Sequence, residues 1–372
     1  MINGLQIWAA AHCRSVMAFY EALAKELKVP LRILCEEIDS DRFELGWSRD
    51  EFAHLEIMQT GRTLEERKKQ LEERKSWAQW FSTYQNCPHI MPIMEKAKGL
   101  GCLVAIGSEA PSNGIRPSLR RSIKASPFFY MMLRRRISKA VSIADYIVNY
   151  SGDETLDLQR IGWPANKILP FGYYPPPLQG LKPRTRTIED WRKFNILITG
   201  KMDWRRGQDV AVEALEILKG WGYLPQAVFT QKGELYNTLC KQIAKAKINV
   251  ELVGFVEYEK LLEYYRECSV FLAPGRVEPW GMRINDALNA GAPLIVSRGM
   301  GGAKIVRDYG CGLTFNAGDA LDLAYQLKRM MDSSEEYLSF AKYVPVAIEG
   351  CSPQRKAQEL VKLIGNRFPD WV

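Results

Sequence analysis

Two carboxylates and a helix start give residues 278–293 the most distinctive chemistry of the sequence. Glu278 lies on a Pro-Trp-Gly turn, and Asp286 follows eight residues later in a short apolar stretch that reads as a helix opening at Gly281. The first backbone N–H groups of a helix have no partner within it, and its dipole is positive at that end. The segment therefore predicts a phosphate-binding helix start, flanked by carboxylates that accept hydrogen bonds from sugar hydroxyls.

A plainer interpretation is that residues 278–281 form only a turn and that the apolar residues after them form only a core face, since such signals are common. These apolar residues are Met282, Ile284, Ala287, Leu288 and Ala290. A second segment upstream favours the binding site.

In this second segment, residues 196–198 read as a buried strand, and an amphipathic helix follows from about residue 208. Between them Gly200 lies in a turn that carries Lys201 and Arg206. In a doubly wound sheet such a loop lies at the carboxyl edge of its strand, where ligands bind. Either cation alone is equally well explained as a solvated loop residue, but two cations around a glycine turn favour an anion site.

At these residues the sequence resembles the retaining GT-B glycosyltransferases of the group 1, or GT4-type, family. Members carry a motif of Glu, seven residues and Glu, and here Glu278 matches the first position while Asp286 stands at the second. Their basic pair, in a Gly-Arg to Lys-Gly loop, is matched by Lys201 and Arg206 with the residue types exchanged. Further matches lie at residues 143–151, 167–172, 253–256, 270–274 and 301–302.

The resemblance implies an α/β protein with the GT-B fold, in which two doubly wound Rossmann-like domains face a central cleft. We expect an acceptor-binding domain at residues 1–172, a linker at 173–192 and a nucleotide-sugar-binding domain at 193–350. The last segment, 351–372, is expected to be a helix that crosses back to the first domain. The linker is placed where three consecutive prolines and a basic run disfavour regular structure.

The resemblance also implies roles for the site residues. Lys201 and Arg206 would stabilise the leaving diphosphate, Glu278 would hold the donor sugar and Asp286, one methylene shorter than the usual Glu, the ribose. The remaining donor-binding positions are Gly200, Phe255, Val256, Trp280, Gly281 and Met282, with the backbone of Phe255 and Val256 at the base. No Asp-x-Asp cluster stands out as a Mg²⁺ site, so we expect neither a metal nor a cofactor besides the nucleotide-diphosphate sugar donor.

The acceptor side depends on the loop after a predicted strand at residues 102–107. Many relatives place a His there, whereas this chain has Glu109, which would polarise the acceptor hydroxyl or balance a cationic transition state. A loop carboxylate that caps a turn is an equal alternative. His12, at the end of the first predicted strand, is a second candidate for this side, and His54 and His89 are expected to be structural.

The composition of the 372 residues is that of a folded protein large enough for two domains, with 47% hydrophobic residues. The eight cysteines are scattered without metal-ligand spacing, which is typical of reduced thiols in a cytosolic protein. The sequence shows neither a signal peptide nor an apolar stretch long enough to span a bilayer, so we expect a cytoplasmic location.

The net charge is concentrated in residues 110–144. Eight basic residues and no acidic ones lie there, and the 43 Lys and Arg that remain of 51 equal the 43 Asp and Glu. An apolar, aromatic run at residues 127–133 lies within this basic segment. The eight are Arg116, Arg120, Arg121, Lys124, Arg134, Arg135, Arg136 and Lys139.

This basic segment predicts attachment to an anionic membrane surface. One alternative is that residues 128–133 belong to the core and the cations form a solvated face. Nucleic-acid binding ranks last because no nucleic-acid module accompanies the patch.

Alternating strands and helices predict parallel sheets with right-handed crossovers. In the first half we expect strands at residues 4–10, 31–36 and 102–107, and helices at 14–27, 63–81 and 89–98. Helices are also expected from about residue 335 to the end.

Together these features predict a retaining, metal-independent glycosyltransferase of the hexosyltransferase type. We favour a UDP-sugar over a GDP-sugar as donor, and a lipid-linked or cell-surface polysaccharide or glycolipid acceptor at the inner face of the cell membrane. One alternative is a nucleotide-sugar epimerase or hydrolase on a related fold. Another is a non-enzymatic protein that binds membranes or nucleic acid through residues 110–144.

Overall fold

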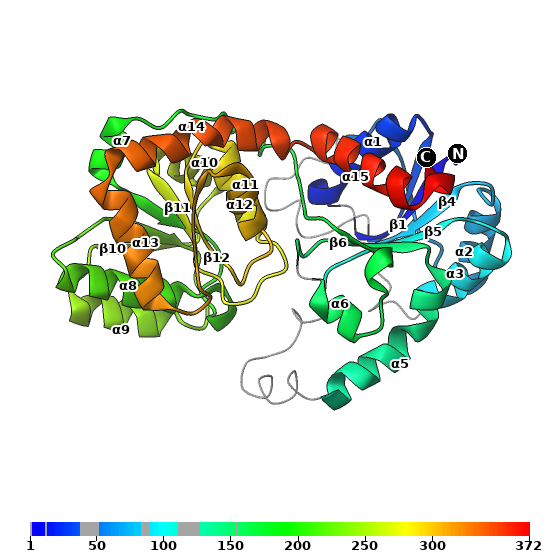
Figure 1. Cartoon of the computed structure of the whole chain (residues 1–372), viewed down its shortest axis with the longest axis horizontal. Coiled ribbons are helices and arrows are strands. Elements are labelled where there is room, and N and C mark those ends of the chain that lie inside the picture. Colours follow the sequence, from blue (N-terminus) through cyan, green and yellow to red (C-terminus); the bar gives the residue numbers. More distant parts are fainter. Residues whose placement is uncertain (1, 12, 38–51, 83–88, 111–126, 154) are drawn as a thin grey trace. The chain divides into compact units, whose positions relative to one another are not determined.

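The computed structural model describes residues 2–11, 13–37, 52–82, 89–110, 127–153 and 155–372. The chain divides into two units: unit 1 comprises Met1–Pro176 and Ser352–Val372, and unit 2 comprises Pro177–Cys351. Each unit is a parallel sheet with helices on both faces (Figure 1). The predicted α/β class with two doubly wound domains is thus confirmed.

Among the described residues, the sheet of unit 1 has seven parallel strands in the order β3-β2-β1-β4-β5-β6-β7. The winding reverses between β1 and β4, as in dinucleotide-binding sheets. Helices α2, α3 and α5 lie on one face, and α1 and α15 pack together on the other (Figure 1). The strands are β1 Leu5–Ala11, β2 Leu31–Glu37, β3 Glu56–Gln59, β4 Ala78–Phe81, β5 Val104–Ser108, β6 Tyr146–Asn149 and β7 Ile168–Pro170. The helices are α1 Arg14–Leu27, α2 Leu64–Glu72, α3 Ile90–Gly99, α5 Pro127–Ile143, α6 Leu156–Arg160 and α15 Pro353–Arg367, with short 3₁₀ turns η4 Ala165–Lys167 and η6 Pro369–Trp371.

The C-terminal segment of the chain is anchored in unit 1. The Ser352 hydroxyl accepts a hydrogen bond from the backbone N–H of Arg355 and so caps α15, which then packs on α1. Beyond the helix, the rings of Phe368 and Trp371 each lie 4.8 Å, centroid to centroid, from that of the buried Tyr146 on β6. These aromatic contacts fix the end of the chain to the sheet.

The sheet of unit 2 has six parallel strands among the described residues, in the order β10-β9-β8-β11-β12-β13, and its winding reverses between β8 and β11. Helices α8, α9 and α13 lie on one side and α10 and α11 on the other (Figure 1). The strands are β8 Ile196–Ile198, β9 Ala227–Thr230, β10 Val250–Gly254, β11 Val270–Ala273, β12 Leu294–Ser297 and β13 Gly312–Phe315. The helices are α7 Ile188–Lys193, α8 Gln208–Gly220, α9 Tyr236–Ala246, α10 Tyr258–Glu267, α11 Met282–Asn289, α12 Ala303–Tyr309, α13 Ala320–Asp332 and α14 Ser334–Gly350, with the 3₁₀ turn η5 Trp204–Arg206.

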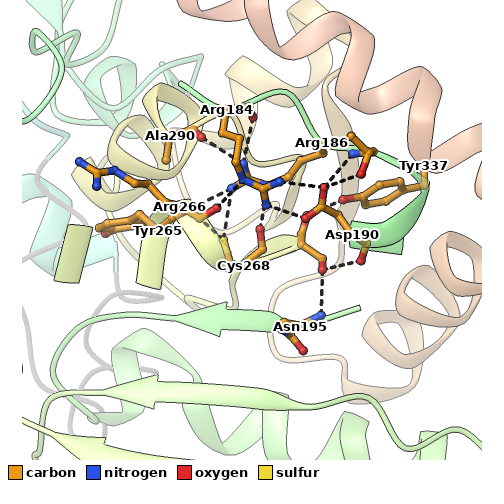
Figure 2. A network of polar contacts seen from close by, with 11 residues as sticks. Arg184, Arg186, Asp190, Asn195, Tyr265, Arg266, Cys268, Ala290 and Tyr337 are labelled. Carbon is orange, nitrogen blue, oxygen red and sulfur yellow. Dashed lines mark hydrogen bonds and ion pairs between the residues drawn. The ribbon is translucent and has the colours of Figure 1, made fainter. Parts of the chain in front are cut away.

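The predicted linker at 173–192 is wrong at its C-terminal end, because unit 2 begins at Pro177 and includes helix α7. Arg186 is only 2% exposed and donates hydrogen bonds to the backbone oxygens of Tyr265, Cys268 and Ala290 (Figure 2). The Arg184 guanidinium donates to both carboxylate oxygens of Asp190 at 3.0 and 2.5 Å. The basic run that suggested a solvated linker is therefore fastened into unit 2 by its own cations.

The predicted helix at residues 63–81 is wrong in its second half. Thr63 and Glu66 form a capping box that starts α2, but the helix ends at Glu72. Residues 78–81 instead form β4, which lies between β1 and β5 and is buried along its whole length. The prediction extended the helical spacing of the charged residues in α2 into the apolar run 78–81. That run instead forms a central strand buried on both faces of the sheet.

The described part of the basic segment is α5, a helix with an exposed apolar stripe. Phe128 is 67% exposed, Met131 44% and Met132 51%, so the alternative that this run belongs to the core is wrong for these three residues. Arg134, Arg135 and Arg136 are also exposed. The other predicted contributors Arg116, Arg120, Arg121 and Lys124 lie outside the described residues. Within the described ranges, no helix is both long and apolar enough to cross a membrane.

Candidate functional site

The candidate donor site lies at the point where the strand order of unit 2 reverses. β8 and β11 are neighbours there, and parallel strands direct their following loops to the same edge of the sheet. The loop after β8 carries Lys201 and Arg206, and the loop after β11 carries Glu278. Nη2 of Arg206 lies 3.9 Å from Oε1 of Glu278, so the fold brings together two residues that are distant in sequence.

The loop after β8 is held by polar contacts of its own. The Gln208 side chain, 1% exposed, donates to the backbone oxygens of Gly200 and Lys201, both at 3.1 Å. Asp203 accepts a hydrogen bond from the backbone N–H of Arg206 at 3.0 Å and so caps the turn η5. The Lys201 side chain is exposed, whereas the side chain of Arg206 is only 25% exposed.

The loop after β11 is fixed to the loop after β12. The backbone N–H of Glu278 donates to the oxygen of Gly299 at 3.1 Å, and the N–H of Gly301 donates to the oxygen of Glu278 at 3.2 Å. Gly281 has φ +92°, and a Cβ there would lie 2.4 Å from Cε of Met300. A glycine is therefore required where the loop turns into α11.

The first turn of α11 is formed as the sequence predicts, with Met282 as its first residue. Trp280 is 1% exposed and donates its indole N–H to the side-chain oxygen of Asn285 at 2.8 Å. Its ring is buried next to the start of α11 and does not line a surface. Asp286 lies one turn further along α11 and is half-buried.

Arg283, which the sequence interpretation missed, is the second cation at Glu278. It is 8% exposed, and its guanidinium donates to the backbone oxygen of Thr199 at 2.8 Å and to Oε2 of Glu278 at 2.5 Å. Gly200 provides the room, because a Cβ on it would lie 2.1 Å from Nη1 of Arg283 and 2.8 Å from Nη1 of Arg206. Gly200 thus serves the packing of two guanidinium groups.

The electrostatics of this cluster favour an anion. Burial lowers the pKa of the Arg206 guanidinium below its ordinary value, and the charge of Arg283 lowers it further, against the opposing effect of Glu278. Nε of Arg206 is buried and makes no hydrogen bond to the described residues, with Oδ2 of Asp203 lying 3.9 Å away. A buried guanidinium with an unsatisfied N–H, crowded by a second one, is stabilised by any anion that approaches it.

The predicted base-binding residues lie in the loop after β10. Phe255 is 60% exposed and Val256 is half-buried. β10 is separated from β8 by β9, so this loop emerges at the same edge of the sheet, two strands away from Lys201. The structure therefore places both residues at the same edge of the sheet as the loops after β8 and β11.

In unit 1, Glu109 follows β5 and is held by a tyrosine. The hydroxyl of Tyr173 donates to Oε1 of Glu109 at 3.1 Å, and burial, followed by the charge of Glu109, raises the pKa of Tyr173 well above its ordinary value. His12 lies outside the described residues. The Nε2 atom of His54 lies 3.0 Å from Oε1 of Glu21 on α1.

Cysteine and metal chemistry give no further site in the part of the chain that the structure describes. Seven cysteines there form no disulfide bond, and six of them are buried. Within the same part, no group of three or more His, Cys, Asp or Glu side chains is arranged to hold a metal ion.

Comparisons with known proteins agree with this geometry. Residues 184–345 match the family model described as glycosyl transferases group 1. The amylovoran biosynthesis glycosyltransferase AmsK of Erwinia amylovora is 29% identical over 163 residues, which are 42% of this chain and 39% of AmsK. The match thus spans well under half the length of that curated relative.

Solved structures match over nearly the whole chain. Anabaena Alr3699/HepE in complex with UDP has a TM-score of 0.70 at 14% identity, covering 98% of this chain and 100% of that chain. The lipopolysaccharide outer core galactosyltransferase WaaB in its apo form has a TM-score of 0.64 at 13% identity, covering 98% and 100%. At these identities the likeness shows the fold, and the predicted GT-B fold is confirmed.

Proposed function

We propose, from the premise that residues 184–345 place this chain in the group 1 glycosyl transferases, that it transfers a sugar from a nucleoside-diphosphate sugar to an acceptor hydroxyl. The observation that carries the proposal is the cluster of Arg206, Glu278 and Arg283 at the switch point of unit 2, beside the start of α11. This arrangement combines cations, the N–H groups at a helix start and a carboxylate. These are the groups needed to bind a diphosphate and a sugar together.

The proposed chemistry breaks the bond between the anomeric carbon and the phosphate oxygen and forms a bond to the acceptor oxygen, with retention of configuration. The acceptor proton passes to the leaving phosphate or to Glu109. Negative charge develops on the leaving diphosphate and positive charge on the sugar ring. We propose that Lys201, Arg206 and the N–H groups after Gly281 stabilise the diphosphate without a metal ion.

The other assignments are proposals from the family resemblance. Glu278 would accept hydrogen bonds from hydroxyls of the donor sugar, and Asp286 from the ribose. The backbone at Phe255 and Val256 would contact the base. Glu109, oriented by the Tyr173 hydroxyl, would act on the acceptor.

The choice of donor and acceptor class draws on the names of the matched proteins. HepE was crystallised with UDP, which supports a UDP-sugar as donor. AmsK is named for amylovoran biosynthesis and WaaB for the lipopolysaccharide outer core. We therefore propose a polysaccharide or lipid-linked acceptor.

An acceptor of this kind fits attachment to the inner face of the cell membrane, and helix α5 supports that location. Phe128, Met131, Met132 and Arg135 are spaced to lie on one helical face, and all four are exposed. Apolar side chains beside cations suit the boundary of an anionic bilayer. Co-sedimentation with phosphatidylglycerol vesicles should fall in a variant with Phe128, Met131 and Met132 changed to Ser. Equal binding by both proteins would refute this location.

The function is tested by ligand binding followed by turnover. In a thermal-shift panel of UDP- and GDP-linked sugars, we expect a UDP-sugar to raise the melting temperature of the chain. Lys201→Ala and Glu278→Gln should each lower transfer by about 10²-fold. Lys241→Ala, an exposed lysine on α9, is the control and should not.

Two outcomes would overturn the proposal. If no nucleotide sugar binds, or if both site variants transfer as well as the wild type, the chain is not a glycosyltransferase of this mechanism. If the donor is converted at full rate with no acceptor present, the epimerase or hydrolase alternative holds instead.

A further inference from the structure

We infer that Arg283 is a positioning residue, which holds Glu278 by one carboxylate oxygen and leaves the other for a hydroxyl of the donor sugar. This inference rests on the proposed function and assigns a residue that acts through Glu278. It starts from the geometry of the three side chains. Arg283 contacts Oε2 of Glu278 at 2.5 Å, whereas Oε1 lies 3.9 Å from Nη2 of Arg206, beyond hydrogen-bond distance.

The Arg283 side chain is itself fixed at both ends of its guanidinium. Nη2 donates to Glu278, while Nη1 donates to the backbone oxygen of Thr199, the residue directly after β8. The Thr199 hydroxyl in turn lies 3.1 Å from the hydroxyl of Tyr265, which is 1% exposed. A planar guanidinium held by two acceptors cannot rotate freely, so the carboxylate bonded to it is held as well.

The surroundings are shaped for this contact. Gly200 has φ +104°, and a side chain on it would occupy the position of the Arg283 guanidinium. Arg283 is also too deeply buried, at 8% exposure, for an ordinary surface cation. A buried arginine costs free energy of desolvation, and here its two partners are a backbone oxygen and the predicted sugar-binding carboxylate.

The geometry indicates different roles for the two arginines beside Glu278. Arg206 has a side chain that is 25% exposed and lies beyond hydrogen-bond distance of Glu278, so its guanidinium is available to the diphosphate. Arg283 uses both of its terminal nitrogens on protein acceptors and acts on the ligand only through Glu278. Loss of Arg283 should therefore reduce the affinity contributed by the sugar, while the affinity for the nucleoside diphosphate should stay nearly unchanged.

The experiment compares the dissociation constants of UDP and of the UDP-sugar that stabilises the wild-type chain most in a panel of UDP-glucose, UDP-galactose and UDP-N-acetylglucosamine. Arg283→Met should reduce the affinity gained from the sugar by about tenfold, the effect of one hydrogen bond to a charged group. UDP alone should bind within about twofold of the wild type. The value of kcat should fall more than KM rises, because the sugar is no longer held for reaction.

Two further variants separate positioning from simple structural support. Arg283→Lys keeps the charge but reaches with a single nitrogen, so it should restore part of the sugar-dependent affinity and remains informative if Arg283→Met does not fold. The double variant Arg283→Met with Glu278→Gln should be no worse than Glu278→Gln alone, because Arg283 acts through that carboxylate. Arg329→Met is the control, since it breaks an Arg–Glu pair between α13 and α14.

The outcomes are distinct. Additive effects in the double variant, or equal losses for UDP and the UDP-sugar, would overturn the positioning role and make Arg283 a direct phosphate ligand or a structural residue. Unchanged binding in Arg283→Met would also overturn it. If none of the UDP-sugars binds the wild-type chain, the proposed function fails and the inference fails with it.

Discussion

Replacing Arg186 by Met should destabilise unit 2 more than any surface substitution. The Arg186 guanidinium donates to the backbone oxygens of Cys268 at 2.8 Å, Tyr265 at 2.9 Å and Ala290 at 3.3 Å (Figure 2). Tyr265 and Cys268 lie at the end of α10, and Ala290 caps the end of α11. One buried cation thus satisfies the last carbonyls of two helices at their negative ends.

The magnitude follows from what the substitution leaves behind. Hydrogen bonds from a charged donor contribute about 1.5–3 kcal/mol each when a buried acceptor is left unpaired. Against these losses, Met avoids the desolvation of a buried charge, which costs several kcal/mol. We therefore expect a net loss of about 3–5 kcal/mol in the free energy of unfolding. With a slope of about 2 kcal/mol per molar urea, the midpoint should fall by roughly 2 M.

Unfolding in urea is monitored by hydrogen exchange in peptides from residues 258–290. These peptides report on α10 and α11 and not on unit 1. Arg192→Met is the matched control, because Arg192 lies on the nearby helix α7 with an exposed side chain paired to Glu189. Arg186→Lys, with one nitrogen in place of three, should fall between the two. The reasoning is refuted if Arg186→Met costs no more stability than Arg192→Met.

Two further predictions concern carboxylates that accept hydrogen bonds from neighbouring side chains. Burial raises the pKa of Asp190, but the hydrogen bond from Arg184 and the backbone N–H of Thr187 lower it more, so the net pKa lies below its ordinary value of 3.8. A carboxylate whose folded-state pKa is depressed stabilises the fold above about pH 4, and this contribution is lost as the pH falls through the folded-state pKa. The urea midpoints of Asp190→Asn and wild type should therefore differ at pH 7, and the difference should shrink as the pH is lowered below 4. Tyr173→Phe removes the hydrogen bond to Glu109 and should lower kcat of transfer by about tenfold with UDP affinity unchanged. An unchanged kcat would count against a role of Glu109 in transfer.

The sequence predicted the parts of the fold that local signals determine. Helix α1 has the predicted ends at Arg14 and Leu27. In the candidate donor site, Gly281 marks the start of α11 as expected. Each of these boundaries depends on residues within a few positions of the boundary itself.

The sequence could not predict features that depend on contacts distant along the chain. Arg186 reads as part of a solvated basic run, yet three of its backbone acceptors, on Tyr265, Cys268 and Ala290, lie 79 or more residues away. Residues 78–81 follow a charged helix without a glycine or proline to end it, and they form a strand because β1 and β5 flank them. The burial of β4 between β1 and β5 depends on the whole sheet, so the residues at the end of α2 do not indicate it.

The contacts of Arg283 in the candidate site could not be predicted from the sequence either. On a helix, ion pairs are expected at spacings of three or four, whereas Arg283 follows Glu278 by five residues, with the turn at Gly281 between them. Its other acceptor, Thr199, is 84 residues away. The one local signal was the arginine itself, at a position between Met282 and Ile284 in a stretch that otherwise reads as apolar.

The structural role of Gly200 also differs from the role that its sequence context indicates. A glycine between a strand and a basic turn reads as a residue that admits a phosphate close to the backbone. In the structure the space beside its Cα is filled by the guanidinium groups of Arg283 and Arg206. An alanine there would be strained at φ +104° and would displace the arginine that holds Glu278. Gly200, Arg283 and Glu278 therefore act as one unit, and a change in any of them should be interpreted through the carboxylate.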